Sequence, residues 1–295
     1  MFSTLKHQFR WRRAADKWGP RRLLVADLGT DETRIITVAR EGGDLAWESC
    51  QTMPSLDDNL TIDGRAFSEI LREVGGRQQY VSMVSAAGIV RLLSFSGRPA
   101  RGEGLDTQVQ QTLGVDDTHS IRHIVAHRVT EPADKAQYSV MASTLPVAHV
   151  EQLANCVVEA NFTPVTLVPR GVAVLNMATQ AEGVLKEDKA QGFLQIDAGT
   201  STLLLFVGTR LGLARKFRKG TGTSVESIMS VYDLDRETAE KLFSSGSIDF
   251  SELPSDAVRS WMHQVGISLD FIERRHDVRV EFVNLAGCGT DVNVL

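Results

Sequence analysis

The sequence has few cysteines and lacks the features of several common protein classes. Its three cysteines, Cys50, Cys156 and Cys288, are odd in number, widely spaced and form no Cys-x-x-Cys pair. This argues against a disulfide framework and a zinc site, and it fits a reducing compartment. No apolar run approaches the roughly 18 residues needed to span a bilayer, and the first residues lack the apolar core of a signal peptide. We therefore expect a cytoplasmic protein.

Several catalytic and binding motifs are also missing. The sequence contains no P-loop, no Gly-x-Gly-x-x-Gly fingerprint and no Ser-His-Asp or Cys-His arrangement with supporting context. His119, His123 and His127 recur every fourth residue, which would align three metal ligands on a helix. Their β-branched surroundings predict a strand instead, where this alignment fails. The net charge of −5 gives no general attraction to nucleic acid, so no nucleic-acid partner is expected.

An internal repeat is present. A chain of 295 residues is long enough for two lobes. Leu23–Ala26 is a short apolar strand followed by Asp27-Leu28-Gly29-Thr30 and a second strand, and the same order recurs about 170 residues later at Phe193–Ile196 and Asp197-Ala198-Gly199-Thr200. The repeat predicts two similar hairpins, one in each half of the chain.

The two Asp-x-Gly-Thr turns are suited to holding phosphates from opposite sides. Glycine lets the backbone approach closely, exposed N–H groups and the threonine hydroxyl bind phosphate oxygens, and the aspartate can hold a hydrated magnesium ion. One such turn is ordinary hairpin chemistry, but the pair is more specific. A third glycine turn follows the apolar run at 282–286, where backbone could pack against adenine or ribose.

The remaining elements predict α/β architecture with an inserted unit. Between 98 and 145 the pattern indicates a small α+β subdomain with its helix at Leu105–Leu113. The polar segment Ala181–Ala190 is the best candidate for a linker between lobes. Further helices are expected at Gly64–Val74, Val147–Ala160, Val172–Thr179, Thr223–Tyr232, Arg236–Phe243 and Ser255–Arg275.

From Leu23 to Leu295 the sequence resembles the PilM family of type IV pilus assembly proteins, which is related to the division protein FtsA. The resemblance is carried by "LVADLGTDETRIITV", "FLQIDAGTSTLLLFVGTRLGLARKFRKGTGT", "RETAEKLF" and "VNLAGCGTDV". It implies an α/β, actin-like (ribonuclease H-like, duplicated) two-lobed fold. The implied domains are a first lobe at 23–190, which carries the insertion at about 98–145, and a second lobe at 191–295.

The resemblance also implies an ATP site with Mg²⁺, in which Asp27 and Asp197 hold the metal through water. The residues matched to this site lie in the two phosphate turns, at the start of a nearby helix, on the ribose-contacting helix and in the adenosine turn: Asp27, Gly29, Thr30, Arg34, Asp197, Gly199, Thr200, Gly220, Gly222, Glu240, Gly287 and Gly289.

The sequence departs from the family pattern at this site. Asp31 and Glu32 replace small hydroxyl residues and would repel a triphosphate unless magnesium or Arg34 intervenes. Phe243 replaces a family lysine, Cys288 interrupts the last glycines, and relatives continue beyond the position of Leu295 with a further helix. These changes predict weak ATP binding and negligible hydrolysis, so the expected role is at most a weak ATPase, or a pseudo-ATPase scaffold.

Three functions remain open from the sequence. The first is a scaffold of a pilus or related secretion complex at the inner membrane that binds the cytoplasmic tail of a PilN-like membrane protein. The second is an active ATPase or phosphotransferase of the actin-like and sugar kinase superfamily. The third is an FtsA-like division protein. Self-association is also left open.

The first 22 residues differ from the rest in composition. They contain seven basic residues, one acidic residue, Asp16, and the aromatic residues Phe2, Phe9, Trp11 and Trp18. Such an arm is suited to an anionic membrane surface or to a protein partner. A disordered terminus is the alternative.

Overall fold

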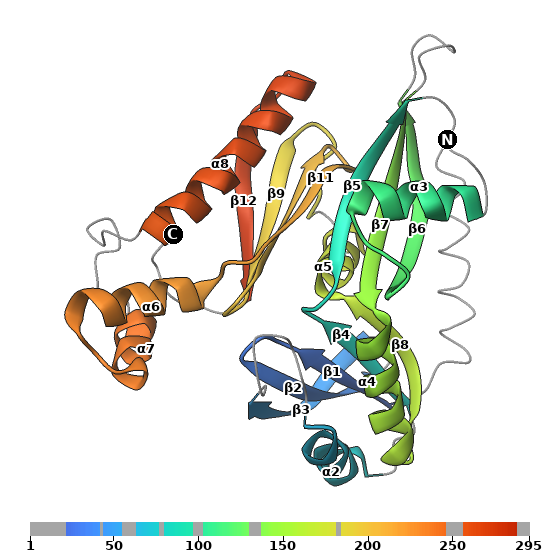
Figure 1. Cartoon of the computed structure of the whole chain (residues 1–295), viewed down its shortest axis with the longest axis vertical. Helices are drawn as coiled ribbons and strands as arrows, with labels where there is room; N and C mark the ends of the chain where they lie inside the picture. The colour runs from blue at the N-terminus through green and yellow to red at the C-terminus, as the bar shows by residue number, and fades with distance from the viewer. Residues whose placement is uncertain are drawn as a thin grey trace.

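The computed structural model describes residues 22–41, 44–54, 63–76, 80–96, 103–129, 137–180, 184–245 and 256–287. The structure contains three sheets (Figure 1). The predicted N-terminal arm at 1–22, apart from Arg22, lies outside the described residues, as does Gly289. No helix within these ranges is long and apolar enough to cross a membrane.

The first sheet has five strands and forms the base of the molecule. Its order is β3 (Asp44–Pro54), β2 (Glu32–Glu41), β1 (Arg22–Leu28), β4 (Tyr80–Ser85) and β8 (Thr163–Pro169). The β1–β2 hairpin is antiparallel, whereas β4 and β8 run parallel to β1 and to each other. Helices α2 (Gly64–Gly75) and α4 (Val147–Glu159) pack on one face, where their apolar side chains join the buried core of the sheet.

The second sheet repeats the beginning of the first. Its order is β11 (Arg210–Phe217), β10 (Ser201–Val207), β9 (Ala190–Ile196) and β12 (Val280–Gly287), with an antiparallel β9–β10 hairpin and β12 parallel to β9. Helix α8 (Asp256–His276) covers one face through Trp261, Val265 and Ile272. Helix α5 (Arg170–Gln180) packs on the other face. Because both faces are covered, every residue of β9 is buried.

The third sheet is small and carries the inserted unit. Strands β5 (Ile89–Ser96), β7 (Gln137–Pro146) and β6 (His119–Val129) are antiparallel in this order. Helix α3 (Glu103–Leu113) packs on one face through Leu105 and Val109. The strand that was predicted through the three histidines is confirmed as β6, and no group of metal-ligating side chains gathers anywhere among the described residues.

Two further helices, α6 (Thr221–Tyr232) and α7 (Arg236–Ser245), form a hairpin with its own apolar contacts around Ile228 and Ala239. They extend from the end of the second sheet that faces the first sheet (Figure 1).

The predicted elements are largely confirmed, with small shifts at their ends. Both hairpins, the helix of the insertion and the long helix near the end of the chain are present. Strands β3 and β11 were not predicted from the sequence. Ala190, which was assigned to the linker, is the buried first residue of β9.

Candidate functional site

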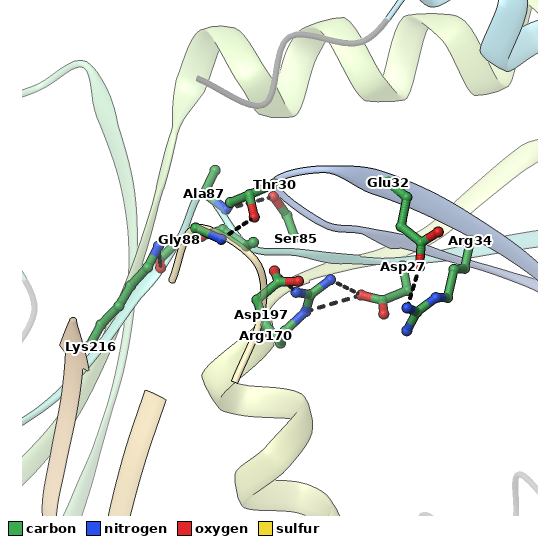
Figure 2. Close-up of polar contacts among 12 residues, drawn as sticks. Asp27, Thr30, Glu32, Arg34, Ser85, Ala87, Gly88, Arg170, Asp197 and Lys216 are labelled. Carbon is green, nitrogen blue, oxygen red and sulfur yellow. Dashed lines mark hydrogen bonds and ion pairs between the residues drawn. The ribbon is translucent and has the colours of Figure 1, made fainter. Parts of the chain in front are cut away.

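The first turn joins β1 to β2 and requires glycine. The Gly29 N–H donates to the carbonyl oxygen of Glu32 at 2.9 Å. A Cβ atom at Gly29 would lie 2.6 Å from that oxygen, which no side chain tolerates without a backbone shift. Arg34 forms an ion pair with Glu32, so one of the two unexpected carboxylates of this turn is neutralised locally (Figure 2).

The second turn joins β9 to β10 and lies directly against the first. The Asp197 N–H donates to the carbonyl of Thr200 at 2.8 Å, which closes the turn. The Gly199 N–H donates to the Thr30 hydroxyl oxygen at 2.7 Å. Thr30 is only 8% exposed, so its hydroxyl is largely shielded from water. Two turns that are about 170 residues apart in the sequence are thus in contact.

Arg170 connects the two aspartates that the sequence analysis placed at the metal. It is the first residue of α5. Its Nε and Nη2 donate to Asp27 Oδ1 at 3.1 and 2.5 Å, and its Nη1 pairs with Asp197 Oδ2. The guanidinium lies between both carboxylates (Figure 2), and its side chain is 11% exposed.

The sequence analysis did not identify Arg170. One local signal exists, because a cation in the first turn of a helix faces the positive end of the helix dipole and is unfavourable without an acidic partner. The partners are 143 and 27 residues away in the sequence, so the sequence alone does not reveal which carboxylates they are.

Charges near the two turns oppose one another. Burial raises the pKa of Asp197, and the charges of Asp31 and Asp27 raise it further, whereas Arg170 lowers it.

Lys216 on β11 also reaches this region. Its Nζ donates to the Gly88 carbonyl at 3.0 Å and to the Ala86 carbonyl. Burial, with the charges of Arg170 and Arg218, lowers the pKa of Lys216 to about 8.

The glycines at the start of α6 are required by close packing against the second turn. A Cβ atom at Gly220 would lie 1.8 Å from the Asp197 carbonyl oxygen, and one at Gly222 would lie 2.9 Å from that of Ala198. The N–H groups of Thr221 and Gly222 donate to these same two carbonyls at 3.0 and 2.8 Å. The first amides of α6 are therefore used to fix the second turn.

The remaining predicted site residues lie on α7 and β12. Glu240 pairs with Arg236 on the same helix at 3.3 Å, and its side chain is 52% exposed. Gly287 ends β12 with a φ of 102°, and a Cβ atom there would lie 2.0 Å from the Ile196 carbonyl. Gly287 therefore lies against Ile196, the last residue of β9, which directly precedes Asp197 in the chain. Glu240 pairs with a residue of its own helix.

The two carboxylates that the resemblance assigns to Mg²⁺ face a cation of the protein itself. Magnesium binds oxygen ligands at about 2.1 Å. Asp27 Oδ1 and Asp197 Oδ2 face the guanidinium of Arg170, so a metal ion bound directly to both oxygens would have to displace this side chain. The contact through water stays a prediction.

The chain is similar in structure to proteins of known structure. No protein-family model and no curated protein matches the sequence. A solved structure of a PilM–PilN type IV pilus biogenesis complex matches with a TM-score of 0.70 and 20% identity, over 93% of this chain and 84% of the other. The ethanolamine utilization protein EutJ from Carboxydothermus hydrogenoformans matches with a TM-score of 0.50 and 14% identity, over 92% of this chain and 78% of the other.

These similarities confirm, at the level of fold, the resemblance to PilM that the sequence motifs indicated. The chain has the α/β, actin-like, two-lobed fold with a small inserted α+β subdomain.

Proposed function

We propose that this protein is a cytoplasmic, actin-like scaffold of a type IV pilus or related secretion assembly complex, located at the inner membrane. The observation that carries the proposal is the similarity of nearly the whole chain to PilM in a complex with PilN. In this role the protein binds the cytoplasmic tail of a PilN-like membrane protein. Its N-terminal arm provides a second contact with the membrane.

The inserted subdomain is the proposed surface for the tail. A pocket of about 340 Å³ lies between α3 and β6, lined by Asp106, Gln110, His119, Ile121 and Arg122. Strand β6 forms one edge of this sheet, whereas the other outer strand, β5, lies alongside β11 of the second sheet. An extended peptide can add to such an edge and place side chains in the adjacent pocket.

Peptide binding tests this proposal. The probe is a synthetic peptide with the N-terminal cytoplasmic segment of a PilN-like protein, titrated by calorimetry. We expect Arg122→Glu to weaken binding by about tenfold or more, because it reverses a charge at the pocket. Arg259→Glu on α8 is the control, since Arg259 is similarly exposed but distant in the fold. Equal affinity for all three proteins would exclude this surface.

We propose that the two turns bind ATP weakly and that the protein does not hydrolyse it at a significant rate. The Gly199, Thr221 and Gly222 N–H groups already have oxygen partners within the protein, and Arg170 neutralises the carboxylates that would hold magnesium. This favours a scaffold over an active ATPase or phosphotransferase. Calorimetry with Mg-ATP is expected to give a Kd near millimolar, and a micromolar Kd with steady turnover that Asp197→Ala abolishes would contradict it.

A further inference from the structure

We propose that the guanidinium of Arg170 holds Asp27 and Asp197 together at the two turns, in place of a divalent metal ion. These are the same two turns that form the proposed ATP site. This proposal does not depend on nucleotide or tail binding, because its test uses metal ions alone.

The geometry of the guanidinium supports this assignment. Three of its nitrogen atoms face two carboxylates that come from different sheets, Asp27 at the end of β1 and Asp197 after β9. A planar guanidinium can bind two carboxylates at once through separate N–H groups. It therefore performs the bridging that a metal ion between two aspartates would otherwise provide.

The position of Arg170 is fixed by the helix that it begins. Val174, Leu175 and Ala178 of α5 are buried against the second sheet, so the backbone of Arg170 cannot move far without exposing apolar surface. A Cβ atom on Gly29 would lie only 3.4 Å from Arg170 Nη2 and 3.5 Å from Asp197 Oδ1. The guanidinium is thus enclosed between α5 and the first turn.

Two facing carboxylates in a buried site repel each other strongly unless a cation lies between them. The side chain of Asp197 is only 5% exposed and that of Asp27 is 28% exposed. Loss of Arg170 would remove the cation that lies between the two carboxylates, and the vacated space and four carboxylate oxygens would then suit Mg²⁺ or Mn²⁺.

The test compares the wild-type protein with Arg170→Ala in three solutions, which contain EDTA, Mg²⁺ or Mn²⁺ without nucleotide. We expect the wild-type melting temperature to be the same in all three. The variant is expected to melt at least about 5 °C lower in EDTA and to regain at least half of this loss with metal. Electron paramagnetic resonance should detect Mn²⁺ bound to the variant and none bound to the wild type.

Two controls separate a metal effect from general destabilisation. Arg215→Ala removes a half-buried arginine that donates to the hydroxyl of Ser268 and the amide oxygen of Gln264, and metal should not restore the stability of this variant. Arg170→Ala/Asp197→Asn removes the extra negative charge as well, so it should fold without metal and bind no Mn²⁺. The proposal is wrong if the wild type is itself stabilised by metal or binds Mn²⁺. It is equally wrong if neither metal binds or stabilises Arg170→Ala.

Discussion

Single glycines determine whether the second turn can pack against α6. Gly220 leaves no room for a methyl group, because its Cβ would lie 1.8 Å from the Asp197 carbonyl oxygen. Gly266, inside α8, has nothing within 4 Å of the same position. These two glycines provide a matched pair in one protein.

We expect opposite effects of alanine at these two positions. Gly220→Ala should lower the free energy of unfolding by at least about 3 kcal/mol, because the backbone must shift. Gly266→Ala should raise it by about 0.5–1 kcal/mol, since alanine favours the helix interior. Urea denaturation measures both changes, and a loss of less than 1 kcal/mol for Gly220→Ala would show that the turn adapts.

Lys216 gives the protein a pH-dependent stability above neutral pH. Its pKa falls from 10.5 in the unfolded chain to about 8 in the folded protein, mainly because it is buried. Between these two values the unfolded state binds more protons than the folded state, so stability rises with pH in this window. Below pH 8 the cost of burying the ammonium is constant.

We therefore expect the stability of the wild type relative to Lys216→Met to increase by about 1 kcal/mol per pH unit between pH 8 and pH 10. Lys241→Met on α7 is the control, since Lys241 is exposed and pairs with Glu237 at the surface, and this substitution should leave the pH dependence of stability unchanged. The free energy of unfolding of each protein is measured by denaturation at five pH values. Parallel stability curves for the wild type and Lys216→Met would contradict this expectation.

At the scale of elements, α8 is attached to the second sheet by apolar contacts and by hydrogen bonds, among them a buried bond of Trp261. The Trp261 Nε1–H donates to Ser201 Oγ at 3.0 Å. Trp261 is 5% exposed and Ser201 is fully buried. The bond therefore fixes the helix on β10 at a position next to the second turn.

Trp261→Phe should lower the free energy of unfolding by about 1–3 kcal/mol, because the buried Ser201 hydroxyl loses its partner. Adding Ser201→Ala to this variant should cost less than Ser201→Ala costs in the wild type. Met262→Ala, at the exposed neighbouring position, should change stability by less than about 1 kcal/mol. Additive effects of Trp261→Phe and Ser201→Ala would show that the hydrogen bond contributes little.

Elements whose sequences show an apolar face were predicted. Two strands, β3 and β11, were not, because their sequences show no regular apolar pattern. Five consecutive residues of β3, Glu48 to Thr52, are exposed, so this edge strand has no apolar periodicity to detect. In β11, Gly212, Arg215 and Lys216 interrupt the apolar pattern. Only the fold explains why this strand carries two charged side chains: Lys216 hydrogen-bonds to the first lobe, and Arg215 hydrogen-bonds to α8.

The sequence likewise predicted part of the candidate site, namely its two turns, but not the arginine between them. The duplicated turns identified Asp27, Thr30, Asp197 and Gly199 by motif. In the structure, Thr30 contacts Gly199 directly, and Arg170 joins Asp27 to Asp197. Their binding role stays a prediction. Arg170 was missed because an arginine has no fixed spacing from its acidic partners, and only the packing of α5 between the sheets brings the three side chains together.

At the scale of the whole molecule, the two lobes are held by both polar and apolar contacts. The polar contacts join Arg170 to Asp197, Thr30 to Gly199, and Lys216 to the turn between β4 and β5. The apolar contact places Val90 and the buried residues of α5 against Phe193, Leu204 and Phe206 of the second sheet. These contacts do not depend on a shared strand.

The same arrangement has a consequence for chain connectivity. All described strands of the first and third sheets come from residues before 170, all strands of the second come from residues after 189, and the chain passes between the halves only once, after α5. Fragments 1–182 and 183–295 should therefore associate without a covalent link when they are co-expressed, because α5 presents its apolar face to the second sheet. Co-purification through a tag on one fragment would detect the pair. Disruption of that face by Leu175→Asp should abolish it, whereas the exposed Met177→Asp on the same helix should leave it intact.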